Sequence, residues 1–166
     1  MSLDNLGDAF YHELRDILGA EKQLLEVMPK MIEAANCPDL KKALEHHKTQ
    51  SEEHVERTEK AFEDTGKAAR AKTCEAMKGI LKETEALLKE DAECTTRDAM
   101  LIAAAQKIEH YEIATYGTLC RWAEVLDYQV ALKELKQNID EEEKTDCKLT
   151  EIAKKINKGA LAGSSS

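Results

Sequence analysis

Hydrophobic residues recur at helical spacing along nearly the whole chain, and no segment shows the strict alternation of a half-buried strand. The pattern predicts long helices up to about residue 35, over residues 38–65, over residues 98–125 and over residues 129–156, with a shorter amphipathic helix over residues 74–90. The joints fall near Cys37 and near Asp127, where the periodicity breaks. The chain is therefore expected to be all-α.

The order of these helices favours one bundle topology. Short joints make each pair an antiparallel hairpin, whereas about 30 residues separate the second long helix from the third. A four-helix bundle with one long crossover, here carrying the short fifth helix, is the arrangement of ferritin-like proteins. We expect one such domain over residues 1–158, followed by a disordered C-terminal tail over residues 159–166.

Composition argues against several kinds of binding partner and site. The formal net charge of -9 argues against a nucleic-acid partner and against an anionic membrane surface. No run of 18 apolar residues and no basic, apolar leader is present, which predicts a soluble cytoplasmic protein without membrane partner. The five cysteines lack a CxxC pair, so neither a disulfide scaffold nor a cysteine zinc site is expected.

Several acidic residues occupy positions where the helical pattern predicts a buried apolar residue. Glu109 and Glu112, in the stretch EHYE, lie on the apolar face of the third long helix. Each residue of a helix is rotated about 100° from the one before it, and this rotation places Leu101, Ile113 and Tyr116 on the same face as the two acids. The same test places acids, an amide and an imidazole on the inward faces of the other helices: Glu21 on the first, Gln50 and His54 on the second, and Glu142 and Asp146 on the fourth.

These residues also fall at one height in the bundle. Glu21 lies about 16 residues before the first joint, level with the segment between Gln50 and His54 in an antiparallel hairpin. Glu112 and Glu142 lie about 15 residues before and after the second joint. All four long helices are therefore expected to direct polar groups into one central layer.

Five carboxylates in an apolar interior would repel one another, and divalent cations would relieve that cost. Oxygen-rich sites with imidazole suit iron (Fe) or manganese (Mn), so we expect two such ions per chain. The predicted metal ligands are Glu21, Gln50, His54, Glu109, Glu112, Glu142 and Asp146. The alternatives are that each acid meets a Lys or Arg, or that the helix phases are wrong by one residue.

Two further inward residues are less expected as ligands. His47 lies one turn from Gln50 and could bind metal, but a supporting or core role is favoured. Tyr116 could hydrogen-bond to a ligand carboxylate, although simple packing is favoured. No site role is expected for His12, His46 or His110.

Three segments carry a resemblance to a known family: AEKQLLEVMPK (20–30), DAMLIAAAQKIEHYEIATYGTL (98–119) and EEEKTDCKLTEIA (141–153). With them, nearly the whole chain resembles the YciF-type family of bacterial ferritin-like stress proteins, which are relatives of the rubrerythrins. The resemblance implies a di-iron site in which Glu21 matches the first helix and Glu109 with Glu112 match an ExxE pair. The chain departs from this pattern because it has no ExxH, and Gln50 stands where family members carry Glu.

Two function hypotheses follow. The first is a dinuclear iron or manganese protein of bacterial stress response that reacts with peroxide or oxygen, with an external electron donor because the rubrerythrin CxxC iron domain is absent. The second is a non-catalytic helical dimer that retains a ferritin-like site for structure or scaffolding. Iron storage or DNA protection in a large shell is less favoured, since the chain has no basic tail. A homodimer is expected under either hypothesis because Leu87, Ala92 and the crossover offer apolar positions that a four-helix core leaves uncovered.

Overall fold

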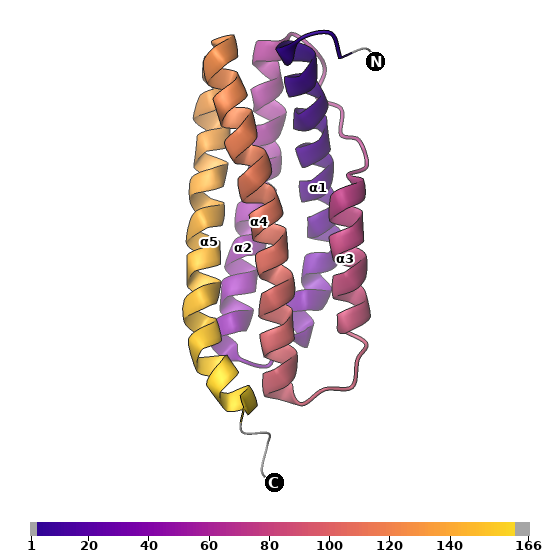
Figure 1. The fold of residues 1–166 in the computed structure, drawn as a ribbon, viewed down its shortest axis with the longest axis vertical. Coiled ribbons are helices and arrows are strands. Elements are labelled where there is room, and N and C mark those ends of the chain that lie inside the picture. The colour runs from indigo at the N-terminus through magenta and orange to yellow at the C-terminus, as the bar shows by residue number, and fades with distance from the viewer. Residues whose placement is uncertain (1–2, 162–166) are drawn as a thin grey trace.

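The computed structural model describes residues 3–161, and all of its regular elements are helices. They are α1 (Leu6–Ala34), α2 (Pro38–Ala61), a 3-10 turn (η1, Phe62–Thr65), α3 (Glu75–Leu87), α4 (Cys94–Leu126) and α5 (Gln129–Leu161). The four long helices lie side by side, and α3 packs outside the bundle against α1 and α4 (Figure 1). The predicted four-helix bundle with a crossover and a short fifth helix is thus confirmed.

The joints between helices are fixed by specific side chains and backbone geometry. The buried carboxylate of Asp98 on α4 accepts hydrogen bonds from the backbone N–H groups of Asn36 (2.8 Å) and Cys37 (2.7 Å). These donors precede Pro38, which begins α2, so the acid stabilises the positive end of that helix. At the second joint, Asp127 adopts φ 56° and ends α4 in a left-handed turn.

The helix boundaries differ most from the sequence prediction in α4 and α5. Helix α4 begins at Cys94, a turn before the predicted residue 98, and α5 continues to Leu161 rather than ending at Ile156. Ile156 is the last buried residue of α5, so the extra turn carries no apolar signal that a sequence pattern could show. Residues 159–161 are therefore helical, and the remainder of the predicted tail, 162–166, lies outside the described residues.

The crossover lies directly against α1. A Cβ atom added to Gly19 would lie 1.7 Å from the carbonyl oxygen of Lys72, so only glycine permits this close approach. Lys72 in turn donates its backbone N–H to the carbonyl of Arg15 at 3.1 Å, and the Arg15 side chain donates to the carbonyl of Arg70 at 2.8 Å. These contacts hold the crossover over the middle of α1, from where α3 continues along the bundle (Figure 1).

The core is apolar on both sides of a polar layer. On α1, for example, Leu14 and Ile17 precede Glu21, Leu24 and Met28 follow it, and all five are buried. Because apolar side chains lie above and below this layer, its polar groups are shielded from water.

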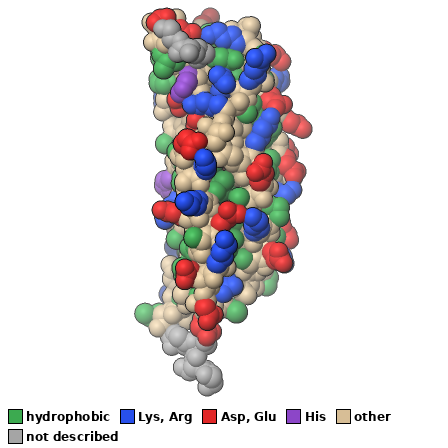
Figure 2. Space-filling model, turned by 90° about the vertical axis from the view of Figure 1, so that its right-hand side faces the viewer, with side chains coloured by type: hydrophobic (Ala, Val, Ile, Leu, Met, Phe, Trp, Pro, Cys, Tyr) green, Lys and Arg blue, Asp and Glu red, His purple; other side chains and the backbone are tan. Residues whose placement is uncertain are grey.

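The outer surface is charged. In Figure 2 acidic and basic side chains are interspersed over one face of the molecule, and hydrophobic side chains appear only in small areas between them. Leu87 and Ala92, on which the expected homodimer rests, are partly buried. No helix within residues 3–161 is long and apolar enough to cross a membrane. The five cysteines, all within this range, are free thiols.

Candidate metal centre

Four helices direct six ionisable side chains into the polar layer. Each is at most 3% exposed: Glu21 from α1, His47 and His54 from α2, Glu109 and Glu112 from α4, and Glu142 from α5. They form two groups in which the potential ligand atoms lie within 4.8 Å of one another. The first comprises His47, Glu109, Glu112 and Glu142, and the second comprises Glu21, His54 and Glu142. Glu142 belongs to both groups and lies where they meet.

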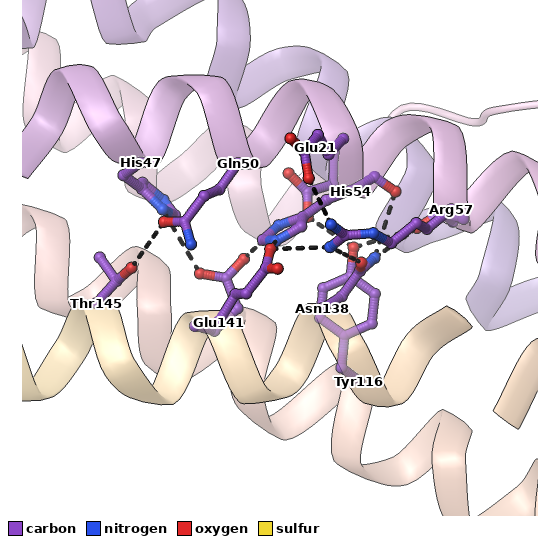
Figure 3. A network of polar contacts seen from close by, with 12 residues as sticks. Glu21, His47, Gln50, His54, Arg57, Tyr116, Asn138, Glu141 and Thr145 are labelled. Atoms are coloured by element: carbon purple, nitrogen blue, oxygen red, sulfur yellow. Dashed lines mark hydrogen bonds and ion pairs between the residues drawn. The ribbon is translucent and has the colours of Figure 1, made fainter. Parts of the chain in front are cut away.

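Helical spacing brings these side chains together. Glu109 and Glu112 are three residues apart and therefore lie on one face of α4. His47 and His54 are seven residues apart, about two helical turns, so both imidazoles project from α2 in the same direction. Figure 3 shows His47 and His54 following one another along α2 toward the interior.

The atoms of the centre face one another without forming hydrogen bonds. His54 Nδ1 lies 2.8 Å from Glu142 Oε1, and His47 Nε2 lies 3.1 Å from Glu109 Oε1. The His54 Nδ1, Glu142 Oε1 and His47 Nε2 atoms nevertheless have no partner of hydrogen-bond geometry within residues 3–161. The same is true of both carboxylate oxygens of Glu112, one of Glu109 and one of Glu21. These nitrogen and oxygen atoms are close together but are not aligned for hydrogen bonds with one another. Such an arrangement is suited to binding a shared cation.

The outward nitrogen of His54 is held by an acid. Its Nε2 donates a hydrogen bond to Glu141 Oε2 at 2.9 Å, and Arg57 Nη1 donates to the same oxygen at 2.8 Å (Figure 3). This leaves Nδ1 directed into the centre. A carboxylate on the far nitrogen of an imidazole fixes the ring orientation and makes the near nitrogen a better ligand.

Glu21 is held by a chain of hydroxyl and amide groups. Tyr116 donates its hydroxyl hydrogen to Glu21 Oε1 at 2.6 Å, and the same hydroxyl lies 3.2 Å from Thr58 Oγ1. Asn138 donates to Thr58 Oγ1 at 3.3 Å, and the three supporting side chains are buried. One carboxylate oxygen of Glu21 is thereby fixed, and the other, Oε2, remains without a partner among the described residues. Tyr116 therefore binds a carboxylate of the centre as well as packing in the core.

Burial and charge divide the carboxylates into two kinds. Burial, together with the neighbouring carboxylate of Glu142, raises the pKa of Glu109 well above its ordinary value. Burial raises the pKa of Glu112 in the same direction, and the charges of Glu21 and Glu142 add to the effect. These two acids therefore favour the protonated form in the metal-free protein.

Glu142 behaves in the opposite way because both imidazoles face it. Burial alone would raise its pKa, but His47 and His54 outweigh burial and lower it to about 2. Burial would likewise lower the pKa of His54, yet Glu21 and Glu142 raise it to about 11. For His47 burial prevails and the pKa is lowered. The metal-free centre thus contains one firmly ionised pair, Glu142 with His54.

Five of the seven predicted ligands are brought together: Glu21, His54, Glu109, Glu112 and Glu142. Asp146 belongs to neither group of acids and histidines, and the amide Gln50 forms a hydrogen bond with a neighbouring helix. Gln50 accepts a hydrogen bond from Thr145 at 3.4 Å, between α2 and α5. Asp146 accepts one from Gln106 at 3.0 Å and lies 3.3 Å from His110 Nε2 on the opposite flank of α5. The i, i+4 spacing places both residues one turn from the centre, but their side chains turn toward neighbouring helices.

The structure adds two residues to the centre that sequence reasoning did not favour as participants. His47 belongs to the first group, and the signal for it was its seven-residue spacing from His54 on the inward face. Glu141 supports His54 from α5, across the contact between α5 and α2. No periodicity could identify Glu141, because it lies about 100° from Glu142 on the helix and is reached only through the packing of α2.

Comparison with known proteins agrees with this architecture. Residues 5–162 match the family described as a domain of unknown function, DUF892. The chain belongs to the DUF892 family. Protein YciF of Escherichia coli (strain K12) is 40% identical to this DUF892 chain over 163 residues, which are 96% of the chain and 98% of YciF. The YciF-type resemblance noted in the sequence is thereby confirmed.

Two solved structures of relatives share the fold. The crystal structure of the E. coli stress protein YciF superposes with a TM-score of 0.90 at 38% identity, covering 94% of this chain and 99% of that one. A protein named YcfI from Rhodopseudomonas palustris superposes with a TM-score of 0.86 at 38% identity, covering 90% and 97% of the respective chains. The DUF892 bundle is thus shared over nearly the full length of all three proteins.

Proposed function

We propose that this DUF892 protein binds two divalent metal ions, iron or manganese, in its polar layer, and that it reacts there with peroxide or oxygen in bacterial stress protection. The observation that carries the proposal is the set of buried oxygen and nitrogen atoms without hydrogen-bond partners within residues 3–161. An unpartnered buried carboxylate is costly, and a cation is the ligand that offsets this cost for several of them together.

The donor set fits such ions in number, charge and type. One ion would be held by His47, Glu109, Glu112 and Glu142, and the other by Glu21, His54 and Glu142. Four carboxylates would balance the charge of two divalent cations. Mixed carboxylate and imidazole donors suit iron and manganese, whereas structural zinc sites have four ligands and calcium sites are usually built from loop oxygens.

The protein's own residues would position the metals and keep the site dry. When bound, iron or manganese supplies redox chemistry toward peroxide or oxygen. Glu141 orients His54, Tyr116 orients Glu21, and the apolar side chains on either side of the layer exclude bulk water. The E. coli relative is described as a stress protein, which supports the biological setting. Electrons for this reaction would come from an external donor.

The decisive experiment has two stages. Protein isolated without chelator is analysed for metal content, and metal-free protein is titrated anaerobically with two equivalents of Fe(II) or Mn(II). A metal ion that binds only the native state raises the melting temperature. At a free metal concentration 100 times Kd, the free energy of unfolding rises by roughly 2.7 kcal/mol. EDTA should reverse the shift. Peroxide consumption by the loaded protein is measured next, and absence of any melting shift would overturn the proposal.

A second candidate function is a metal-stabilised structural protein. It is favoured by Gln50, which leaves α2 without a carboxylate in the centre, and by the name of the R. palustris relative, which describes a candidate structural protein. A melting shift with metal but no consumption of peroxide or oxygen would favour this candidate. Light scattering tests the homodimer expected under both functions: a monomer at micromolar concentration would contradict it.

A further inference from the structure

A groove of about 400 Å³ opens between α2 and α5 on the outside of the bundle. Its wall carries Lys42, His46, Lys144 and Lys148, with Gln50 and Thr145 also lining it. One acid, Asp39, lies on the same wall. The groove is therefore rich in hydrogen-bond donors and carries an excess of positive charge, although the chain as a whole has a net charge of -9.

The three lysines of the groove form no close ion pair, although the charge of Lys148 acts on Glu151 one helical turn away. None of Lys42, Lys144 and Lys148 has an ion-pair partner within 4.0 Å among the described residues, in contrast to lysines elsewhere on the same helices. Lys48 on α2, for example, pairs with Glu52 at 2.5 Å, and Lys154 on α5 pairs with Glu151 at 2.6 Å. Unpaired ammonium groups on facing helices leave a positive potential in a concave site, which attracts anions.

The groove lies next to the metal centre. The hydrogen bond from Thr145 to Gln50 crosses between α5 and α2 at 3.4 Å, and Gln50 is one helical turn from both His47 and His54. Figure 3 shows Gln50 and Thr145 beside His47, at one end of the polar network. Anything bound in the groove therefore sits on the outer side of the layer that holds the six ionisable residues.

We propose that this groove is a binding site for a small oxyanion, a molecule carrying phosphate or carboxylate groups. Its volume lies within the range of small-molecule sites. Lysine binds phosphate and carboxylate as a point charge. The Gln50 side-chain amide N–H group supplies a neutral donor, because its oxygen is the atom that accepts from Thr145. The site itself does not depend on metal. A role of the groove in binding a substrate next to the metal centre does rest on the proposed function.

The test uses the full chain in its metal-free form, with inorganic phosphate and citrate as probes. Binding is followed by calorimetry and by amide shifts in NMR spectra at low ionic strength. In the variant Lys144→Gln/Lys148→Gln, affinity for the preferred probe should fall at least fivefold. The matched control is Lys155→Gln/Lys158→Gln, which removes the same charge from exposed positions on α5 outside the groove and should change affinity less than twofold.

The probes also identify the chemistry. Tighter binding of phosphate assigns a phosphate group, and tighter binding of citrate assigns a polycarboxylate. The proposal is overturned if neither probe shifts the groove amides, if the control variant weakens binding as much as the groove variant, or if binding requires metal and ignores the lysines. Metal-induced melting shifts, measured on the same variants, should be unchanged. A failure of the groove is thus distinguishable from a failure of the metal centre.

Discussion

His54 Nδ1 lies 2.8 Å from Glu142 Oε1 in the middle of the bundle, and this contact sets the charge state of the metal-free centre. The imidazole is held protonated, with a pKa raised to about 11, although burial alone would lower it. Glu142 is held ionised, with a pKa of about 2. Glu109 and Glu112 have no such compensation, because burial raises the pKa of each. The inward carboxylates therefore differ in what they contribute to stability.

Opposite responses are predicted for Glu112→Gln and Glu142→Gln in the metal-free protein. Because the folded chain keeps a proton on Glu112 that the unfolded chain releases, stability falls as pH rises above the ordinary glutamate range, by up to about 1.4 kcal/mol per pH unit. Glu112→Gln removes this loss and should raise the melting temperature at pH 7.5, with little effect near pH 4. Glu142→Gln removes one of the two acids that face the protonated His54 Nδ1, the other being Glu21, and should lower the melting temperature at pH 7.5.

The control for this pair is Glu143→Gln, which lies on the exposed side of α5 and should change stability by less than about 0.5 kcal/mol. Calorimetric melting at both pH values checks the three variants together. Both core variants should also weaken metal binding, at least about tenfold, since each removes a proposed ligand charge. Parallel stability changes in Glu112→Gln and Glu142→Gln would show that the two acids are not compensated differently.

Metal binding is predicted to release protons at neutral pH. A ligand imidazole must be neutral and ligand carboxylates ionised, so His54 gives up its proton, and Glu109 and Glu112 give up the protons that burial favours. Glu142 releases none, because it is already ionised. We expect release of about one to three protons per chain at pH 6.5 and an apparent affinity that rises with pH. Titration calorimetry in buffers of different ionisation enthalpy measures this number, and a value of zero would contradict the charge states described above.

Glu141 is predicted to control metal affinity without touching the metal. Its carboxylate accepts the Nε2–H of His54 at 2.9 Å, so Glu141→Gln loses the charge that orients the ring. Removal of such a supporting carboxylate typically costs about 10- to 100-fold in metal affinity. The control is Glu53→Gln, because the Glu53 carboxylate also pairs with Arg57 and, unlike that of Glu141, forms no hydrogen bond or ion pair with the His54 ring among the described residues. Equal metal affinities in the two variants would show that Arg57, not His54, is the relevant partner of Glu141.

The bundle was predictable from sequence because its signals are local and repeated. The apolar period is sustained through all four long helices, and the joints carry recognisable breaks at Pro38 and Asp127. The boundaries that differed, at Cys94 and Leu161, lie where helical turns bury little apolar surface. Nothing in a hydrophobic pattern distinguishes such a turn from a loop.

The centre was predictable only in part, because angular position gives a direction but not a partner. Glu21, Glu109, Glu112 and Glu142 were found by their position on apolar faces. Gln50 was expected as a ligand and His47 was not, although both lie on the inward face of α2. In the structure His47 belongs to the first group, whereas Gln50 accepts a hydrogen bond from Thr145 of α5. From the angular positions alone, all inward acids are expected to repel one another. In the structure, however, Glu142 has two imidazole neighbours.

The position of the crossover leads to a prediction about the fold itself. Gly19→Ala should destabilise the protein strongly, because the added Cβ would lie 1.7 Å from the Lys72 carbonyl oxygen, and a backbone atom cannot rotate away. The matched control is Gly79→Ala on α3, where the added methyl group meets nothing within 4 Å. That change should stabilise the protein by roughly 0.5–1 kcal/mol, since alanine favours a helix interior. Chemical denaturation of both variants measures the contrast. If Gly19→Ala leaves the free energy of unfolding unchanged, the crossover can move away from α1 at little cost. In that case the crossover does not hold α1, and with it Glu21, in place.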